Sequence, residues 1–140
     1  MKPGILFWIV GVLALLFNGY GCFDYFMTVS AGTDYLASQG WSQEQIAYWE
    51  AMPAWRVALW AIGVFSGLLA AILFLMRKAF AVLLFAIGPV VFVLNLLATL
   101  FDGGPEVMGA SYYVASMVVL AIIVFFWWYA RRQKKKGVLA

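Results

Sequence analysis

The acidic and basic residues of this chain are sorted to opposite ends of four long apolar runs. The runs cover residues 4–29, 53–76, 79–101 and 109–130. All six acidic residues lie near the ends of the first and third runs or in the segments that follow them, and the basic residues lie at the opposite ends. Only Arg56 breaks the pattern. A chain that crosses a bilayer four times produces this sorting, because each crossing reverses its direction.

Composition supports a membrane protein. Hydrophobic residues make up 66% of the chain and charged residues 11%, whereas soluble domains carry about 25% charged residues. Each run is close to the roughly 20 residues that span a hydrocarbon layer of about 30 Å. Backbone groups inside lipid must be satisfied within the segment, so the runs should be helices. We predict an all-α membrane protein, a single integral membrane domain over residues 1–140 that forms a four-transmembrane-helix bundle.

The basic residues also predict an orientation. Lys and Arg in short loops stay on the cytoplasmic side. The N-terminus, the turn at Arg77 and Lys78, and the basic tail 131–140 should therefore be cytoplasmic, and the segments 30–52 and 102–108 should lie outside. Because the tail directly follows an apolar run, we expect it to bind anionic lipid rather than nucleic acid.

The segment 30–52 carries helix signals of its own. Ser42 and Gln45 have the spacing of a capping box, and Trp41 and Ile46 can form the hydrophobic staple around it. Ile46 and Trp49 lie three residues apart and offer one apolar face. We predict short amphipathic helices outside the membrane, between the first and second spans, with Trp41, Ile46 and Trp49 as a candidate outer lid. Two interpretations stay open: an anchor on the membrane surface, or a lid over a pocket.

Polar residues near the outer ends of the first three spans form the candidate site. Intramembrane polar groups cost free energy and usually face the bundle interior. Arg56 should pair with a carboxylate at similar depth, because a partly desolvated pair satisfies groups that are costly alone. The cluster either staples the helix ends together or forms an outward-facing polar pocket for a small solute. Its predicted members are Asn18, Asp24, Arg56, Asn95, Thr99 and Asp102.

Small residues predict where helices approach closely. Gly63 and Gly67 form a small-xxx-small pair in the second span. The first span carries a stripe at helical spacing that includes Gly11, Ala14 and Asn18. We expect a homo-oligomer, or a place in a larger membrane complex, with the Gly63/Gly67 face or the first-span stripe at the interface.

Catalysis is not expected. The chain has no histidine and one cysteine, Cys22, which leaves no ligand set for haem, iron–sulfur or ordinary zinc sites and no Ser–His or Cys–His nucleophile pair. We therefore predict no catalytic residue, no metal and no cofactor.

One stretch resembles a known family. The residues are Asn18-Gly-Tyr-Gly-Cys-Phe-Asp24-Tyr-Phe-Met-Thr28, then Met52-Pro-Ala-Trp55, Trp60-Ala-Ile-Gly-Val64 and Gly67. They are similar to a family of small bacterial four-span membrane proteins of unsettled function, often given the automatic name sugar transporter. The resemblance covers the first two spans and the segment between them, and it implies a bacterial inner (plasma) membrane protein. The polar cluster is compatible with a sugar but does not select one.

The sequence therefore favours a small polytopic inner-membrane protein that is transport-related or binds a solute through an outward-facing polar pocket. The alternative is a non-catalytic accessory subunit that packs on a larger membrane complex.

Overall fold

The computed structural model describes residues 2–140, and these form six helices with no strand among them. Four are long and apolar enough to cross a membrane: α1 (Ile5–Ala31), α4 (Ala54–Leu75), α5 (Ala81–Phe101) and α6 (Gly104–Lys135). Two short helices, α2 (Thr33–Ser38) and α3 (Gln43–Glu50), connect α1 to α4. The predicted all-α class and the four apolar helices are confirmed, and the chain is a multi-pass membrane protein by the length and composition of its helices.

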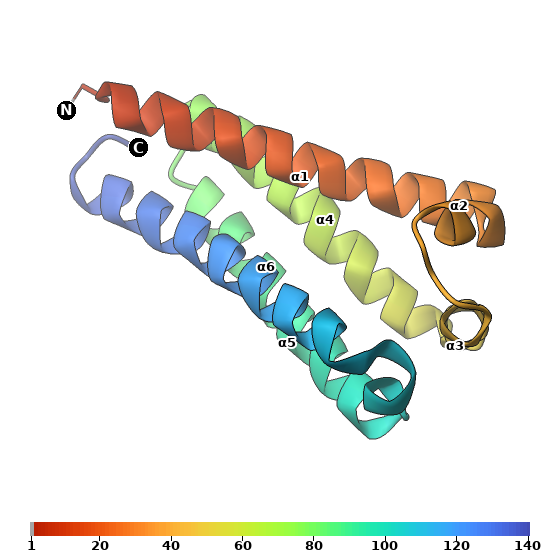
Figure 1. The fold of residues 1–140 in the computed structure, drawn as a ribbon. Helices are drawn as coiled ribbons and strands as arrows, with labels where there is room; N and C mark the ends of the chain where they lie inside the picture. Colours follow the sequence, from red (N-terminus) through yellow and green to blue (C-terminus); the bar gives the residue numbers. More distant parts are fainter. Residues whose placement is uncertain (1) are drawn as a thin grey trace.

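The long helices pack in chain order. α1 lies along α4, α4 along α5, and α5 along α6. Both chain ends and the α4–α5 turn lie at one end of the bundle, and α2, α3 and the α5–α6 connection lie at the other (Figure 1). We call these the basic end and the acidic end, because they carry Arg77 with the basic tail and Asp24 with Asp102, respectively.

The apolar core is concentrated toward the basic end. Phe7 stacks on Phe74 with ring centroids 4.3 Å apart, and Phe74 lies 6.1 Å from the ring of Tyr129. These contacts join α1, α4 and α6. In Figure 1 the ribbons of α1 and α6 are separated at the acidic end, where α2 and α3 lie beside α1 and α4. The buried apolar cluster therefore lies mainly at the basic end of the bundle.

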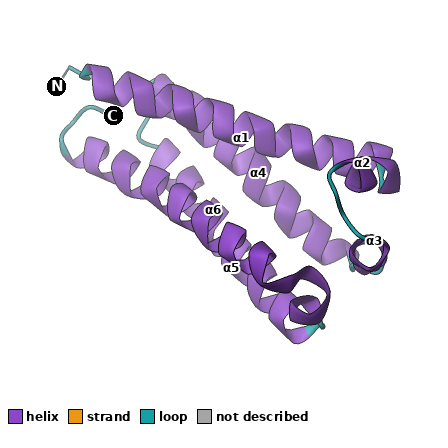
Figure 2. Cartoon of the chain, in the orientation of Figure 1, coloured by secondary structure: helices purple, strands orange, loops and turns teal. Residues whose placement is uncertain are grey.

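The short helices form for the reasons the sequence indicated. Ser42 caps α3 by accepting from the backbone N–H of Gln45 at 3.2 Å, and Gln45 accepts from the N–H of Ser42 at 3.0 Å. This reciprocal pair is the predicted capping box. Figure 2 shows α2 and α3 as separate helices joined by a loop. Pro53 then precedes α4 as its N-cap residue.

The predicted boundaries need one correction, at the basic tail. α6 does not end near residue 130 but continues to Lys135, and Gly137 then turns the chain back with φ +81°, a conformation that favours glycine. Val138 and Leu139 are each 3% exposed and belong to the core. The tail is thus partly a packed structural segment rather than only a solvated charge run, because its last residues are apolar.

The connection between α5 and the main part of α6 is helical rather than a loop. One helical turn follows Gly103, and the helix is broken at Gly109, where φ is +79°. This break coincides with the predicted start of the fourth span at residue 109. The segment before it was predicted as a short loop, but it is helical and buries the side chain of Met108.

Candidate functional site

Arg56 organises the acidic end of the bundle. It lies in the first turn of α4 and is 3% exposed. Its Nε donates to Oδ1 of Asn95 at 2.8 Å, and Nη2 donates to Oγ1 of Thr99 at 2.5 Å and to the backbone oxygen of Asn95 at 3.2 Å. Nη1 forms an ion pair with Asp102 and donates to the hydroxyl of Tyr48 at 3.1 Å. We call these five residues the Arg56 cluster.

All five N–H groups of the Arg56 guanidinium therefore have acceptors within the chain. Asn95 also donates its side-chain amide to the backbone oxygen of Arg56 at 3.2 Å. A fully satisfied arginine has no N–H left for a solute. The arrangement favours the stapling interpretation of Arg56, because it ties α3, α4 and α5 together at their ends.

Tyr48 is a member that the sequence analysis missed. Its hydroxyl donates to Oδ1 of Asp102 at 2.5 Å, and its ring lies 5.9 Å from the Arg56 guanidinium carbon. Burial is the first cause that raises the pKa of Tyr48 above its usual value. The available signal was weak, since Tyr48 precedes Arg56 by eight residues and Pro53 lies between them.

Asp24 does not join the Arg56 cluster, which corrects the predicted six-residue constellation. Its Oδ1 accepts from the hydroxyl of Tyr35 on α2 at 2.6 Å. The hydrogen bond to Asp24 is the main cause that raises the pKa of Tyr35 to about 12. The separation has a simple reason: Arg56 already has Asp102 at the end of α5, and Asp24 has its own donor on the helix that follows α1.

Asn18 is also placed away from Arg56. It is 8% exposed, and its amide donates to the backbone oxygen of Ala14 at 2.8 Å. Its side chain fills the space beside Gly67, where a Cβ would collide with the Asn18 oxygen. Gly63 makes a similar close approach to Val91 of α5. Both glycines therefore lie at close approaches between helices of the same chain.

These contacts correct the predicted oligomer interface. Gly67 faces α1, Gly63 faces α5, and the first-span residues Gly11 and Ala14 are buried against neighbouring helices. The surfaces that were expected to meet a second subunit are therefore already covered within one chain.

A cavity of about 630 Å³ lies between the four long helices and reaches the acidic end. Asn18 and Asp24 line it from α1, Arg56 from α4, and Asn95 from α5. Deeper in the bundle, apolar side chains of α5 and α6 continue its wall, including Phe85, Phe92, Ile123 and Phe126. Thr99 and Asp102 are not among its lining residues. The cavity is thus polar toward the acidic end and apolar below.

The candidate lid is partly in place. Trp41 and Trp49 line the cavity, whereas Ile46 is half-buried and does not. Trp49 packs edge-on against Trp60 of α4 with ring centroids 5.5 Å apart, and Trp60 packs against Tyr25 of α1 at 5.0 Å. This aromatic chain fixes α3 against the helices that flank the cavity.

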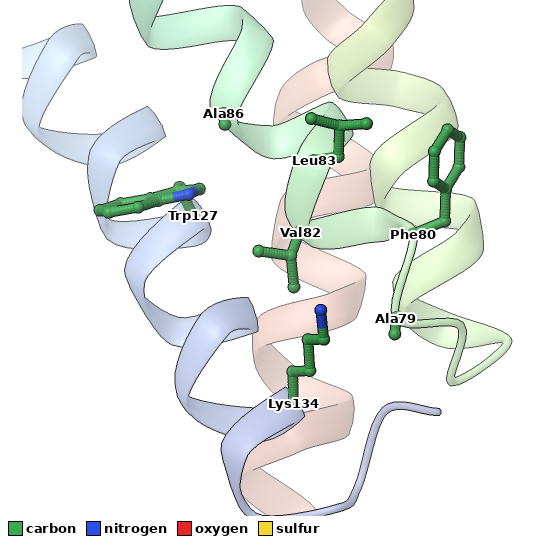
Figure 3. Close-up of a pocket in the computed structure, with 7 residues that line it drawn as sticks. All are labelled: Ala79, Phe80, Val82, Leu83, Ala86, Trp127 and Lys134. Atoms are coloured by element: carbon green, nitrogen blue, oxygen red, sulfur yellow. The ribbon is translucent and has the colours of Figure 1, made fainter.

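A second hollow lies at the basic end, between the start of α5 and the end of α6. It measures about 520 Å³ and is lined by Phe80, Val82, Leu83, Trp127 and Lys134, among others. Figure 3 shows Lys134 rising from α6 toward Val82, with the Trp127 ring higher on the same helix. One ammonium therefore lies beside an otherwise apolar groove.

Two arginines follow two tryptophans by one helical turn near the end of α6. The guanidinium carbon of Arg131 lies 5.5 Å from the Trp127 ring, and that of Arg132 lies 5.5 Å from Trp128. Both arginines are exposed. The geometry is that of an interfacial anchor, with rings at the edge of the apolar zone and cations beyond it.

Within residues 2–140 no group of three His, Cys, Asp or Glu side chains gathers in a way that could hold a metal ion. Comparisons with protein-family models, with curated proteins and with solved structures found no match.

Proposed function

We propose that this chain is a small polytopic inner-membrane protein that binds, and helps to move, a small solute through the cavity at its acidic end. The observation that carries the proposal is the cavity of about 630 Å³ between the four long helices, with Asn18 and Asp24 on its wall and Trp41 and Trp49 beside its polar part. Its volume lies within the roughly 300–1,000 Å³ of ordinary ligand sites.

The proposal separates two roles that the sequence had combined. The Arg56 cluster is the structural support, since every guanidinium N–H is engaged. The solute-facing polar groups are Asp24 and Asn18. This division is supported by the hydrogen bonds, which bring Arg56 to Asp102 and Asp24 to Tyr35.

The proposed orientation places the acidic end outside and the basic end in the cytoplasm. The exposed cations of α6, stacked on Trp127 and Trp128, support this side assignment under the positive-inside rule. We further propose that anionic lipid binds at the basic end, with its headgroup at Lys134 and its acyl chain along the groove below Trp127. The cavity would then open toward the periplasm.

The alternative function, an accessory subunit of a larger complex, has less support. Such a subunit should present an exposed face of small residues to its partner. Here the small residues Gly63 and Gly67 are covered by side chains of α5 and α1. Purification from native membranes, followed by mass spectrometry, discriminates between the two: a solute-binding protein is expected alone or as a homo-oligomer, and a stoichiometric second protein would favour the accessory role.

A pair of adjacent single-cysteine variants tests the cavity itself. In a Cys22→Ser background, Leu59→Cys places a thiol on the cavity wall, whereas Ala58→Cys places one at the same depth on an exposed face of α4. If the cavity is hydrated, a water-soluble maleimide should label purified, nanodisc-embedded Leu59→Cys much faster than Ala58→Cys, because lipid disfavours the reactive thiolate. Equal, slow labelling of both variants would contradict a solute site.

A further inference from the structure

Three polar side chains of the cavity lining have their hydrogens committed within the chain, namely Arg56, Thr28 and Tyr35. The Arg56 guanidinium has no unused N–H. The hydroxyl of Thr28 donates to the backbone oxygen of Asp24 at 2.7 Å, and the hydroxyl of Tyr35 donates to its carboxylate. These side chains line the cavity, but their hydrogens are already committed. Arg56, Thr28 and Tyr35 therefore offer no hydrogen to a ligand, whereas the Asp24 carboxylate can still accept.

Asp24 supplies a negative charge that the chain leaves unbalanced. It lines the cavity, and within residues 2–140 it has a hydroxyl partner but no ion pair. Arg56, which also lines the cavity, has its charge matched by Asp102. The net charge presented to a ligand is therefore that of one carboxylate. In a partly desolvated site such a charge favours a cation and disfavours an anion.

Aromatic side chains surround the same part of the cavity. Trp41, Trp49 and Trp60 line it from the lid side, and Tyr112 lines it from α6. The faces of indole and phenol rings attract cations, and quaternary ammonium groups are recognised by such rings. Below them the wall becomes apolar with Phe92, a surface suited to a hydrocarbon or aromatic body.

We infer that the ligand class of this cavity is an organic cation with an apolar body. The cationic group lies at Asp24 among the aromatic rings, and the apolar body extends between α5 and α6. This inference rests on the proposed function and narrows it. A neutral sugar fits less well, because it would leave the Asp24 carboxylate without a matching charge and has no apolar body for the deeper wall.

Two probes of equal shape and opposite charge test the inference. Tetraphenylphosphonium and tetraphenylborate differ in charge but share size and geometry, so their comparison isolates electrostatics. Binding is measured by calorimetry on the nanodisc-embedded protein, with empty nanodiscs subtracted. We expect saturable binding of the cation, none of the anion, and no competition by neutral sugars.

A matched pair of carboxamide variants locates the charge. Asp24→Asn removes the cavity carboxylate, whereas Asp34→Asn removes an exposed carboxylate on α2, outside the cavity lining. Asp24→Asn should weaken tetraphenylphosphonium binding by at least about tenfold, equivalent to about 1.4 kcal/mol, and Asp34→Asn should leave it unchanged. Asp24→Glu, which keeps the charge, should retain most of the affinity and show that a loss in Asp24→Asn is not misfolding.

The outcomes separate this inference from the proposed function. Binding of tetraphenylborate or of a neutral sugar in place of the cation, with Leu59→Cys still reached by maleimide, overturns the cation class and leaves a solute cavity standing. Equal weakening by Asp24→Asn and Asp34→Asn also overturns it, since surface potential would then explain the effect. If no probe binds and maleimide does not label Leu59→Cys, both the cation class and the proposed solute cavity are overturned.

Discussion

The Arg56 side chain is 4% exposed and pairs with Asp102, whose side chain is 40% exposed at the end of α5. One partner is thus desolvated and the other is in contact with the aqueous boundary. The pair spans α4 and α5, and Tyr48 adds α3 by bonding to both partners. Asp102 matches the charge of the buried arginine and accepts one of its five N–H groups, so loss of the pair would leave a buried charge uncompensated.

Replacing the arginine should therefore weaken the fold. Arg56→Ala leaves Asp102, Asn95 and Thr99 without their donor, and we expect a loss of about 1.5–3 kcal/mol, the range for hydrogen bonds to charged groups. Arg56→Lys keeps the charge but has fewer donors, so its loss of stability should lie between that of Arg56→Ala and zero. Thermal unfolding in detergent measures the change, and Lys135→Ala, at an exposed position of α6, is the control. An Arg56→Ala protein as stable as the wild type would show that the Arg56 cluster does not hold the helix ends together.

The contact between Asn18 and Gly67 predicts a coupled pair of variants. Gly67→Ala adds a Cβ where the Asn18 oxygen lies, and overpacking of this kind costs about 1–3 kcal/mol. Gly88→Ala in α5 meets nothing within 4 Å and serves as the matched control. Asn18→Ala should recover part of the loss when combined with Gly67→Ala, because the two sites share one space. Purely additive effects in unfolding experiments would contradict this packing.

The hydrogen bond from Tyr35 to Asp24 predicts an alkaline transition at the acidic end. Folding raises the pKa of Tyr35 from 10.0 to about 12, first because its hydroxyl donates to Asp24. The folded state therefore holds this proton more tightly than the unfolded state. Its contribution to stability should be complete below pH 10 and should be lost as the pH rises toward about 12. Absorbance titration of tyrosinate in the wild type, compared with Tyr35→Phe, measures this ionisation. A Tyr35 that ionises near pH 10 would contradict the hydrogen bond to Asp24.

Burial of the last residues predicts that the tail supports the α4–α5 turn. The backbone N–H of Ala79 donates to the oxygen of Ala140 at 3.2 Å, and Nε of Arg77 donates to the oxygen of Val138 at 3.1 Å. Leu139→Ala should cost about 2–5 kcal/mol and speed hydrogen exchange of the Ala79 amide. Leu100→Ala, at a position 48% exposed, is the control. An unchanged hydrogen-exchange rate of the Ala79 amide would show that the α4–α5 turn is stable without support from the tail.

Local signals in the sequence predicted much of this fold. The four apolar runs and the capping box at Ser42 depend on residues close together in the chain, and each has a short-range cause. The pairing of Arg56 with a carboxylate at similar depth was also predicted from the run ends, although the choice of Asp102 over Asp24 was not. The ends of the apolar runs and the distribution of charge were therefore sufficient to predict the main helices.

Contacts that depend on side-chain direction could not be predicted. Asp24 and Asp102 end their spans at similar depth, and only the packing of α2 and α3 decides that Tyr35 meets one and Tyr48 the other. The burial of Val138 and Leu139 could not be predicted for a similar reason. Two apolar residues after a run of lysines give no local indication that they pack at the α4–α5 turn.

The most direct test of the central claim, a solute cavity that opens toward the outside at the acidic end, is labelling of intact bacterial cells with a membrane-impermeant maleimide. Single-cysteine variants in the Cys22→Ser background carry the thiol at Leu59 in the cavity, at Glu44 on α3, or at Lys135 near the end of α6. We predict that Leu59→Cys and Glu44→Cys are labelled in intact cells and that Lys135→Cys is labelled only after the cells are made permeable. Labelling of Lys135→Cys in intact cells, or of Leu59→Cys only after permeabilisation, would contradict the account.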